Sequence, residues 1–309
     1  MIDFRYHLVS LISVFLALAV GVVLGAGPLQ NSLGTALNDQ VTALRENRNA
    51  TQAKLEQTET AVNERDSYIT QAASGLLPGT LASKNVAMVL LPEAKAEDAD
   101  AITTQLKSAG ATVTGRVSLT STWVDLSREN YRSTFSGQVQ GHLDSTTSKD
   151  ANGILGEALA KALTANDDSS RVLMDMLSVD KAGTPFVTVD STPTGPAEMI
   201  VVVGPRPQAS SGKGATVEAS PGQDPKAWAK ALTGTASRAT TVVVGSADGD
   251  DNVVSIIRSE GAKVTTIDSV GQIAASVSTP LALASTRAGT TGHYGFDKGA
   301  EAVMPPVTK

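Results

Sequence analysis

The chain of 309 residues contains no cysteine. It therefore has no disulfide framework, no thiolate metal site and no cysteine nucleophile. Aromatic residues make up only 4% of the chain, so valine, alanine, leucine and isoleucine must fill any core, as in α/β domains with buried parallel strands. Basic runs are also missing, and the formal net charge of -6 argues against a nucleic-acid partner.

One long uncharged run is present near the N-terminus, at residues 8–29. At about 1.5 Å per helical residue, this run reaches across a hydrocarbon core of about 30 Å. We therefore predict a single-pass membrane helix there, after a cytoplasmic tip at residues 1–7. The α-amino group and Arg5 precede the helix, and the next basic residue is Arg45, which favours a cytoplasmic N-terminus with the bulk of the chain outside the cytoplasm.

A cleaved signal peptide, cut after Gly27, is the alternative interpretation of this segment. The apolar run exceeds the usual apolar region of about 7 to 15 residues in a signal peptide, which favours an uncleaved anchor. Small residues repeat every four positions on one face of the helix, at Ala17, Gly21 and Gly25. Such a stripe predicts close packing of membrane helices, unless it only reflects the frequency of glycine and alanine in them.

A heptad pattern follows the predicted anchor and indicates a coiled-coil stalk at residues 30–77. Arg48, Thr51, Thr58 and Arg65 interrupt its seam, so two copies would pair only weakly through it. In a coiled coil, the partner of this helix is a second copy of the chain or another protein. The alternative to a coiled coil is an amphipathic helix that folds back on the chain's own domain. The apolar seam residues of the predicted interface are Leu37, Val41, Leu44, Leu55, Val62, Ile69 and Leu76.

Alternating strands and helices predict a compact domain after the stalk. A strand, a helix and a strand follow one another in residues 85–119, and two similar units begin near Met199 and Thr240. Buried parallel strands are unbroken runs of valine and isoleucine, as in the segments MIVVVG and TTVVVG. We therefore predict a doubly wound, mostly parallel α/β domain of four to six strands over residues 81–288.

Three segments do not fit this pattern clearly. Residues 120–195 are predicted to be mostly helical, without a definite place on the sheet. Residues 208–221 have no apolar periodicity and predict an exposed loop. Residues 289–309 contain several glycines and prolines and predict a partly ordered tail.

Ligands of open α/β sheets bind beyond the carboxyl ends of the strands, so the loops at Gly204, Gly245 and Asp248 are candidate ligand loops. None of the turns carries a dinucleotide-binding or P-loop glycine pattern. Asp248 either helps to bind a metal ion or caps the following helix. Ser246 lacks the second flanking glycine of a nucleophile elbow and a histidine at a recognisable spacing. We predict that the chain is not an enzyme and needs no catalytic cofactor, with an unrecognised α/β active site as the weakest alternative.

The N-terminal residues MIDFRYHLVSL, followed by VFLALAVGVVLGAGPL, resemble the N-terminus of the actinobacterial MctB family, named after mycobacterial copper transport protein B. The order of anchor, stalk and α/β domain is similar along essentially the whole chain. The resemblance implies a membrane-anchored, non-enzymatic component of copper efflux. The family also includes a SteB branch, which implies a second hypothesis: a scaffold that pairs with a SteA-type partner and controls cell-wall hydrolysis at the division septum.

Copper, if it binds, must be held by thioether and imidazole groups because the chain has no thiolate. The candidate ligands are Met174, Met176, His142 and His293. Methionines on an apolar stretch also serve as core filler, and no cluster of soft ligands is evident. A single apolar helix has no polar lumen, so conduction would need several copies or a partner.

Overall fold

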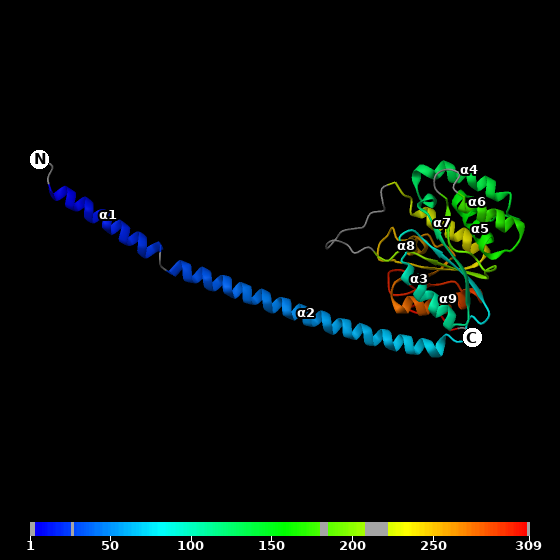
Figure 1. Cartoon of the computed structure of the whole chain (residues 1–309), viewed down its shortest axis with the longest axis horizontal. Helices are drawn as coiled ribbons and strands as arrows, with labels where there is room; N and C mark the ends of the chain where they lie inside the picture. The colour runs from blue at the N-terminus through cyan, green and yellow to red at the C-terminus, as the bar shows by residue number, and fades with distance from the viewer. Residues whose placement is uncertain (1–3, 26–27, 180–184, 208–221, 308–309) are drawn as a thin grey trace. The chain divides into compact units, whose positions relative to one another are not determined.

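The structure is a computed structural model in which the chain divides into two compact units, Met1–Arg65 and Asp66–Lys309 (Figure 1). The loop expected at residues 208–221 lies outside the described residues, and so does Gly27, where a signal peptide would be cut. The residues that the structure describes are 4–25, 28–179, 185–207 and 222–307.

The described part of the first unit is helical. Helix α1 (Phe4–Gly25) is the one helix among the described residues that is long and apolar enough to cross a membrane, with a mean hydropathy of 2.7. Helix α2 (Pro28–Leu76) begins at a proline, whose missing N–H is harmless in the first turn. It continues without interruption into the second unit.

A single seven-stranded sheet forms the centre of the second unit among the described residues, with the strand order β3-β2-β1-β4-β5-β6-β7. Every neighbouring pair is parallel except β2 and β3. The predicted α/β class with a mostly parallel sheet is confirmed. The strands are β1 (Asn85–Leu90), β2 (Thr112–Leu119), β3 (Val187–Ser191), β4 (Met199–Val203), β5 (Thr240–Val244), β6 (Thr265–Ile267) and β7 (His293–Tyr294).

Helices cover both faces of this sheet, so the domain is doubly wound (Figure 1). Helices α4 to α8 pack on one face, and α3, α9 and the C-terminal end of α2 pack on the other. The helices of the domain are α3 (Ala96–Ser108), α4 (Glu129–Gln140), α5 (Ala151–Thr164), α6 (Asp168–Ser178), α7 (Lys226–Arg238), α8 (Val253–Ser259) and α9 (Ile273–Arg287).

The two core layers arise because successive strand side chains point to opposite faces. In β1, Ala87 and Val89 contribute to one apolar cluster, whereas Met88 contributes to the other. All five residues of β4 are buried, as expected for a central strand with helices on both sides.

The last turns of α2 belong to the core of the domain. Ala73 is buried, as is Leu77 directly after the helix, and the partly buried Ile69 packs against the same apolar cluster. Ile69, which the heptad pattern placed in the coiled-coil interface, therefore contacts the chain's own domain in this structure.

Two edge strands differ from the sequence-based expectations. The mostly helical region at residues 120–195 contains β3, which pairs antiparallel with β2. The segment expected as a tail, residues 289–309, contains β7, which pairs parallel with β6. The sheet therefore has more strands than the four to six expected. The largely exposed β3 and the two-residue β7 lack the buried apolar run by which the central strands were recognised.

Helices α5 and α7 make the closest helix contact in the domain. A Cβ atom on Gly156 would overlap the backbone carbonyl of Ala231, and one on Gly234 would overlap that of Gly153. The Thr235 hydroxyl donates a hydrogen bond to the Gly156 carbonyl across this contact, at 3.2 Å. The two backbones can approach this closely only because glycine has no Cβ.

Candidate functional site

The candidate ligand loops lie at the carboxyl edge of the sheet, and the glycines there have structural contacts. The backbone N–H groups of Gly204 and Gly245 extend the sheet by donating to Val244 (2.7 Å) and Ile267 (2.9 Å). A Cβ atom on Gly204 would lie 3.3 Å from a methyl group of Val253, which belongs to α8. These glycines therefore let α8 pack against the ends of the strands.

The order in which strands are added to the sheet reverses between the parallel strands β1 and β4, and an open α/β sheet usually binds its ligand at such a switch point. Here an ion pair joins the segment after β4 to helix α3. Arg206, which follows β4, donates three hydrogen bonds to Asp98 on α3, at 2.7, 2.9 and 3.2 Å. A second carboxylate, Glu97, lies 2.8 Å from the same guanidinium, and Gly271 makes room for the arginine side chain. The chain's own charges are thus paired across this switch point.

Asp248 lies in a small polar cluster between β5 and α8. It accepts a hydrogen bond from Asn252 at 2.7 Å and a short one from the Ser246 hydroxyl. Asn252 also donates to the Ser246 hydroxyl at 3.2 Å. The cluster orders the turn before α8, and the serine hydroxyl has no histidine beside it among these contacts.

A buried ion pair joins α8 to the carboxyl end of β6. Arg258 and Asp268 are 3.0 Å apart, with side chains only 4% and 0% exposed. Asp268 also accepts hydrogen bonds from the backbone N–H groups of Phe296 (2.7 Å) and Asp297 (3.1 Å). A single carboxylate therefore fixes both α8 and the segment after β7 to the sheet.

The half-buried Asp297 lies beside this pair. Burial, together with the negative charges of Asp268 and Asp248, raises the pKa of the Asp297 carboxyl above its ordinary value of 3.8. One of its oxygens accepts a weak hydrogen bond from the backbone of Ala247, at 3.3 Å. The ionised form is thus less favourable in the folded state than in the unfolded chain.

The variant Asp297→Asn is expected to be more stable than the parent at pH 7.5, by about 0.5 to 1 kcal/mol for a screened, half-buried charge. Because the folded-state pKa is raised, the native state binds the proton more tightly, and parent stability falls as pH rises from the unfolded to the folded pKa. The variant has no carboxyl at this position, so its stability should not show this decrease with rising pH. Urea unfolding in detergent at pH 4.5 and 7.5 measures both effects. Equal pH dependence in parent and variant would contradict the assignment, and Asp250→Asn, at an exposed aspartate, is the matched control.

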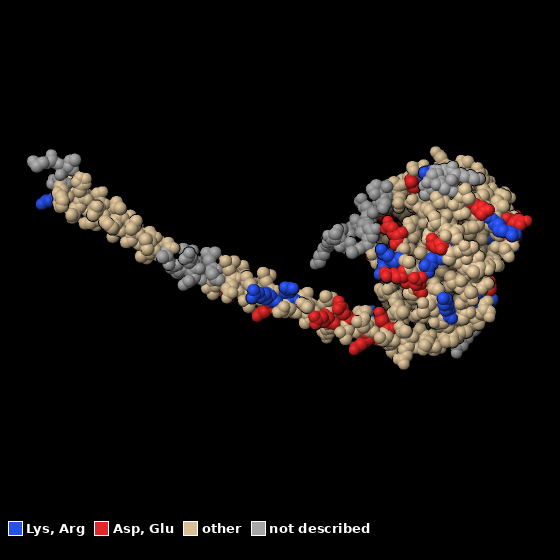
Figure 2. All heavy atoms as spheres, in the orientation of Figure 1, with Lys and Arg blue, Asp and Glu red and all other residues tan. Residues whose placement is uncertain are grey.

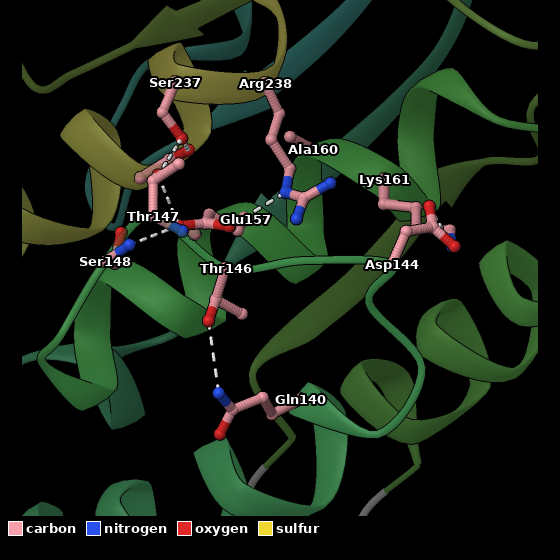
Figure 3. A network of polar contacts seen from close by, with 12 residues as sticks. Gln140, Asp144, Thr146, Thr147, Ser148, Glu157, Ala160, Lys161, Ser237 and Arg238 are labelled. Carbon is pink, nitrogen blue, oxygen red and sulfur yellow. Dashed lines mark hydrogen bonds and ion pairs between the residues drawn. The ribbon is translucent and has the colours of Figure 1, made fainter.

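A second polar network lies on the helical layer around α5 (Figure 3). The carboxylate of Glu157 is fully buried and pairs with Arg238 at the end of α7, at 2.9 Å. Its other oxygen accepts hydrogen bonds from the backbone N–H groups of Thr147 and Ser148, at 2.9 and 2.7 Å. Burial alone would raise the pKa of Glu157, but the hydrogen bonds from Ser148, Thr147 and Arg238 outweigh it and lower the pKa.

Lys161 lies one turn further along α5 and is almost as deeply buried. Its ammonium group donates to the backbone carbonyl of His142 at 3.1 Å and lies 3.1 Å from Asp144. Glu157 and Lys161 therefore hold the α4–α5 loop at two points (Figure 3). Both contacts are structural, because each charge is compensated within the domain.

The comparison with known proteins concerns nearly the whole chain. A family model described as "Copper transport outer membrane protein, MctB" matches residues 1–305. The chain belongs to the MctB family. The similarity inferred from the N-terminal residues is therefore confirmed.

Proteins named "Copper transporter MctB" are also similar to this MctB family member. The protein from Mycobacterium tuberculosis is 29% identical, over 98% of this chain and 99% of the relative. The protein from Mycobacterium leprae is likewise 29% identical, over 99% of this chain and 100% of the relative. These relatives cover both units of the chain, including α1 and α2.

The four candidate copper ligands of this MctB chain do not form one site. His293 lies on the edge strand β7, whereas Met174 and Met176 lie on α6, which contacts β3 at the opposite edge. Six strand spacings separate the two edges, roughly 29 Å. The methionines are two positions apart on a helix, so their side chains point in directions about 160° apart, and both pack against the core.

The two histidines have separate surroundings. His142 follows α4, and its backbone carbonyl is held by Lys161. The Nδ1 atom of His293 shares a hydrogen bond with the Thr266 hydroxyl at 2.9 Å, and burial lowers the pKa of its imidazole. Among the described residues, no three histidine, aspartate or glutamate side chains are grouped to hold a metal ion.

The predicted helix-packing residues lie on exposed surfaces. Ala17, Gly21 and Gly25 are exposed on α1, and a Cβ atom on either glycine would meet nothing within 4 Å. On α2, the seam residues Leu37, Val41, Leu44 and Leu55 are exposed large apolar side chains.

The ion pairs of Asp268 and Glu157 were not predicted from the sequence. The one feature that could have indicated them is a charged residue inside an apolar segment.

Proposed function

We propose that this MctB family member is a non-enzymatic, membrane-anchored envelope protein that takes part in copper efflux. The observation that carries this proposal is the match of the family model to residues 1–305, together with relatives named copper transporters. Helix α1 anchors the chain in the membrane with its N-terminus in the cytoplasm, and the α/β domain lies on the other side of the membrane, outside the cytoplasm.

The contacts at the carboxyl edge support a role without catalysis. Arg206 pairs with Asp98 at the switch point, and Arg258 neutralises the buried Asp268. An enzyme needs a nucleophile or base that is free to meet a substrate. The paired charges of Arg206 with Asp98 and of Arg258 with Asp268 instead hold neighbouring segments together.

A strain that lacks this protein is expected to become more sensitive to copper, with normal septa. The reason is that loss of an efflux component raises intracellular copper without affecting cell separation. Growth over a copper series, intracellular copper content and septal morphology are measured in the same cultures. Normal copper tolerance and normal copper content in the deletion strain would contradict the proposal.

A complementation test asks whether the candidate ligands act directly. Because they do not form one site, the chain with Met174→Leu, Met176→Leu, His142→Gln and His293→Gln is expected to restore copper tolerance. A chain with Met304→Leu, at an exposed methionine, is the matched control. Failure of the fourfold variant alone, at equal protein level, would show that these side chains contribute to copper handling.

A second candidate function is supported by the exposed seam of α2. In this alternative, the chain is a SteB-like scaffold that pairs with a SteA-type partner and controls cell-wall hydrolysis at the division septum. Exposed apolar residues at heptad spacing are typical of a helix that pairs with another helix. The same deletion strain discriminates the two functions, because this one predicts altered septa with unchanged copper tolerance.

A further inference from the structure

The seam of α2 contains two arginines among its apolar residues. In the heptad that places Val41 at position a and Leu44 at position d, Arg48 occupies an a position and Arg65 a d position. Both side chains are exposed and face the same side of the helix as Leu55. A helix that covers the seam must therefore accommodate two guanidinium groups.

Neither arginine has a carboxylate within reach on α2. Residues three and four positions away are neighbours on a helix, and around Arg48 they are Arg45, Leu44, Thr51 and Gln52. Around Arg65 the corresponding residues are Val62, Ala61, Tyr68 and Ile69. The basic side chains of α2 are concentrated before residue 55 and most of its acidic ones after it (Figure 2). The seam charges are thus uncompensated along the helix.

A second copy fits this seam poorly. Two copies anchored through the same N-terminal helix run parallel and in register, so Arg48 faces Arg48 and Arg65 faces Arg65 at partly desolvated positions. One type of flanking pair, Lys54 with Glu59 of the other copy, favours self-association at the g and e positions and occurs twice in such a dimer. Each exposed ion pair of this kind contributes about 0.2 to 1 kcal/mol, and the two together do not offset two like-charge contacts at the partly desolvated seam positions.

We propose that the seam of α2 docks a helix of a different protein, which presents apolar residues opposite Leu44 and Leu55 and carboxylates opposite Arg48 and Arg65. The two carboxylates would pair with the arginines as the partner's apolar residues exclude water. The arginines thereby select the acidic partner and disfavour self-pairing. This inference deepens the second candidate function by giving its partner a defined chemistry.

The partner chemistry can be tested with the chain itself. The full chain has no cysteine, so Leu55→Cys introduces a single cross-linking point in the seam. Two differently tagged full chains are co-expressed in one membrane: one with the native arginines, the other with Arg48→Glu and Arg65→Glu. A membrane-permeant thiol cross-linker then reports which pairs form.

The mixed Arg/Glu pair is expected to cross-link several-fold more than either self pair, and added salt should reduce the excess because screening weakens charge pairing. Equal yields of mixed and native self pairs would overturn the proposal, and so would no cross-linking in any combination. The matched control chain carries Asn49→Glu and Gln57→Glu, which lie outside the seam. This control chain, paired with the native chain, should cross-link no more than the native self pair. The readout uses neither copper nor septa, so its failure is distinguishable from failure of either candidate function.

Discussion

Replacing Asp268 by asparagine is expected to destabilise the α/β domain by about 3 to 5 kcal/mol, the cost of leaving a buried charge without its partner. Arg258 would lose its carboxylate while both positions stay almost inaccessible to water. The amide of asparagine would also turn a donor toward groups that already donate, because Asp268 accepts from Phe296, Asp297 and Ser269. The segment after β7 should also be held less firmly, because it is bound to Asp268 through Phe296 and Asp297.

Urea unfolding of the full chain in detergent, followed by tryptophan fluorescence, measures this effect. Both tryptophans of the chain, Trp123 and Trp228, stack on each other in the domain core. The double variant Arg258→Met with Asp268→Asn should lose less than the sum of the two single variants, because the charges are coupled. Additive losses, or a loss below 1 kcal/mol for Asp268→Asn, would show that the pair does not act as described. Glu260→Gln, at an exposed position, is the control.

The central strands could be predicted from sequence because their physical cause is local. The apolar run of β4 and the three valines of β5 reflect burial on both faces of a parallel sheet. The edge strands contain no such apolar run, so their own residues do not indicate a strand. β3 is mostly exposed and β7 has two residues, so the pairing partner determines both.

The site residues were harder to predict than the fold because their roles depend on contacts between distant segments. Glu157 and Lys161 have the spacing of an exposed pair on one helix, yet each is buried and pairs with a different segment. The Arg206–Asp98 pair joins residues 108 positions apart, and no periodicity links them. Gly204 and Gly245 were recognised as strand ends, but whether they approach a ligand or a helix depends on the position of α8.

The contact between α5 and α7 gives the second large expected effect. Gly156→Ala is expected to destabilise the domain by about 3 kcal/mol, because overpacking forces backbone shifts. The added Cβ would overlap the carbonyl of Ala231, which is backbone and cannot rotate away. Separating the helices would also lengthen the hydrogen bond from Thr235 to the Gly156 carbonyl. This loss exceeds the gain of about 1 kcal/mol that alanine normally brings inside a helix.

Gly137→Ala in α4 separates these two effects, since it is the same substitution in a helix of the same layer. A Cβ atom at Gly137 would meet nothing within 4 Å, so helix propensity alone should act and stabilise the domain by about 0.5 to 1 kcal/mol. If the free energy of unfolding decreases for Gly156→Ala and increases for Gly137→Ala in the same urea assay, the α5–α7 contact requires glycine. If both variants were stabilised, the two helices could separate without loss, and the close approach would not contribute to the stability of the domain.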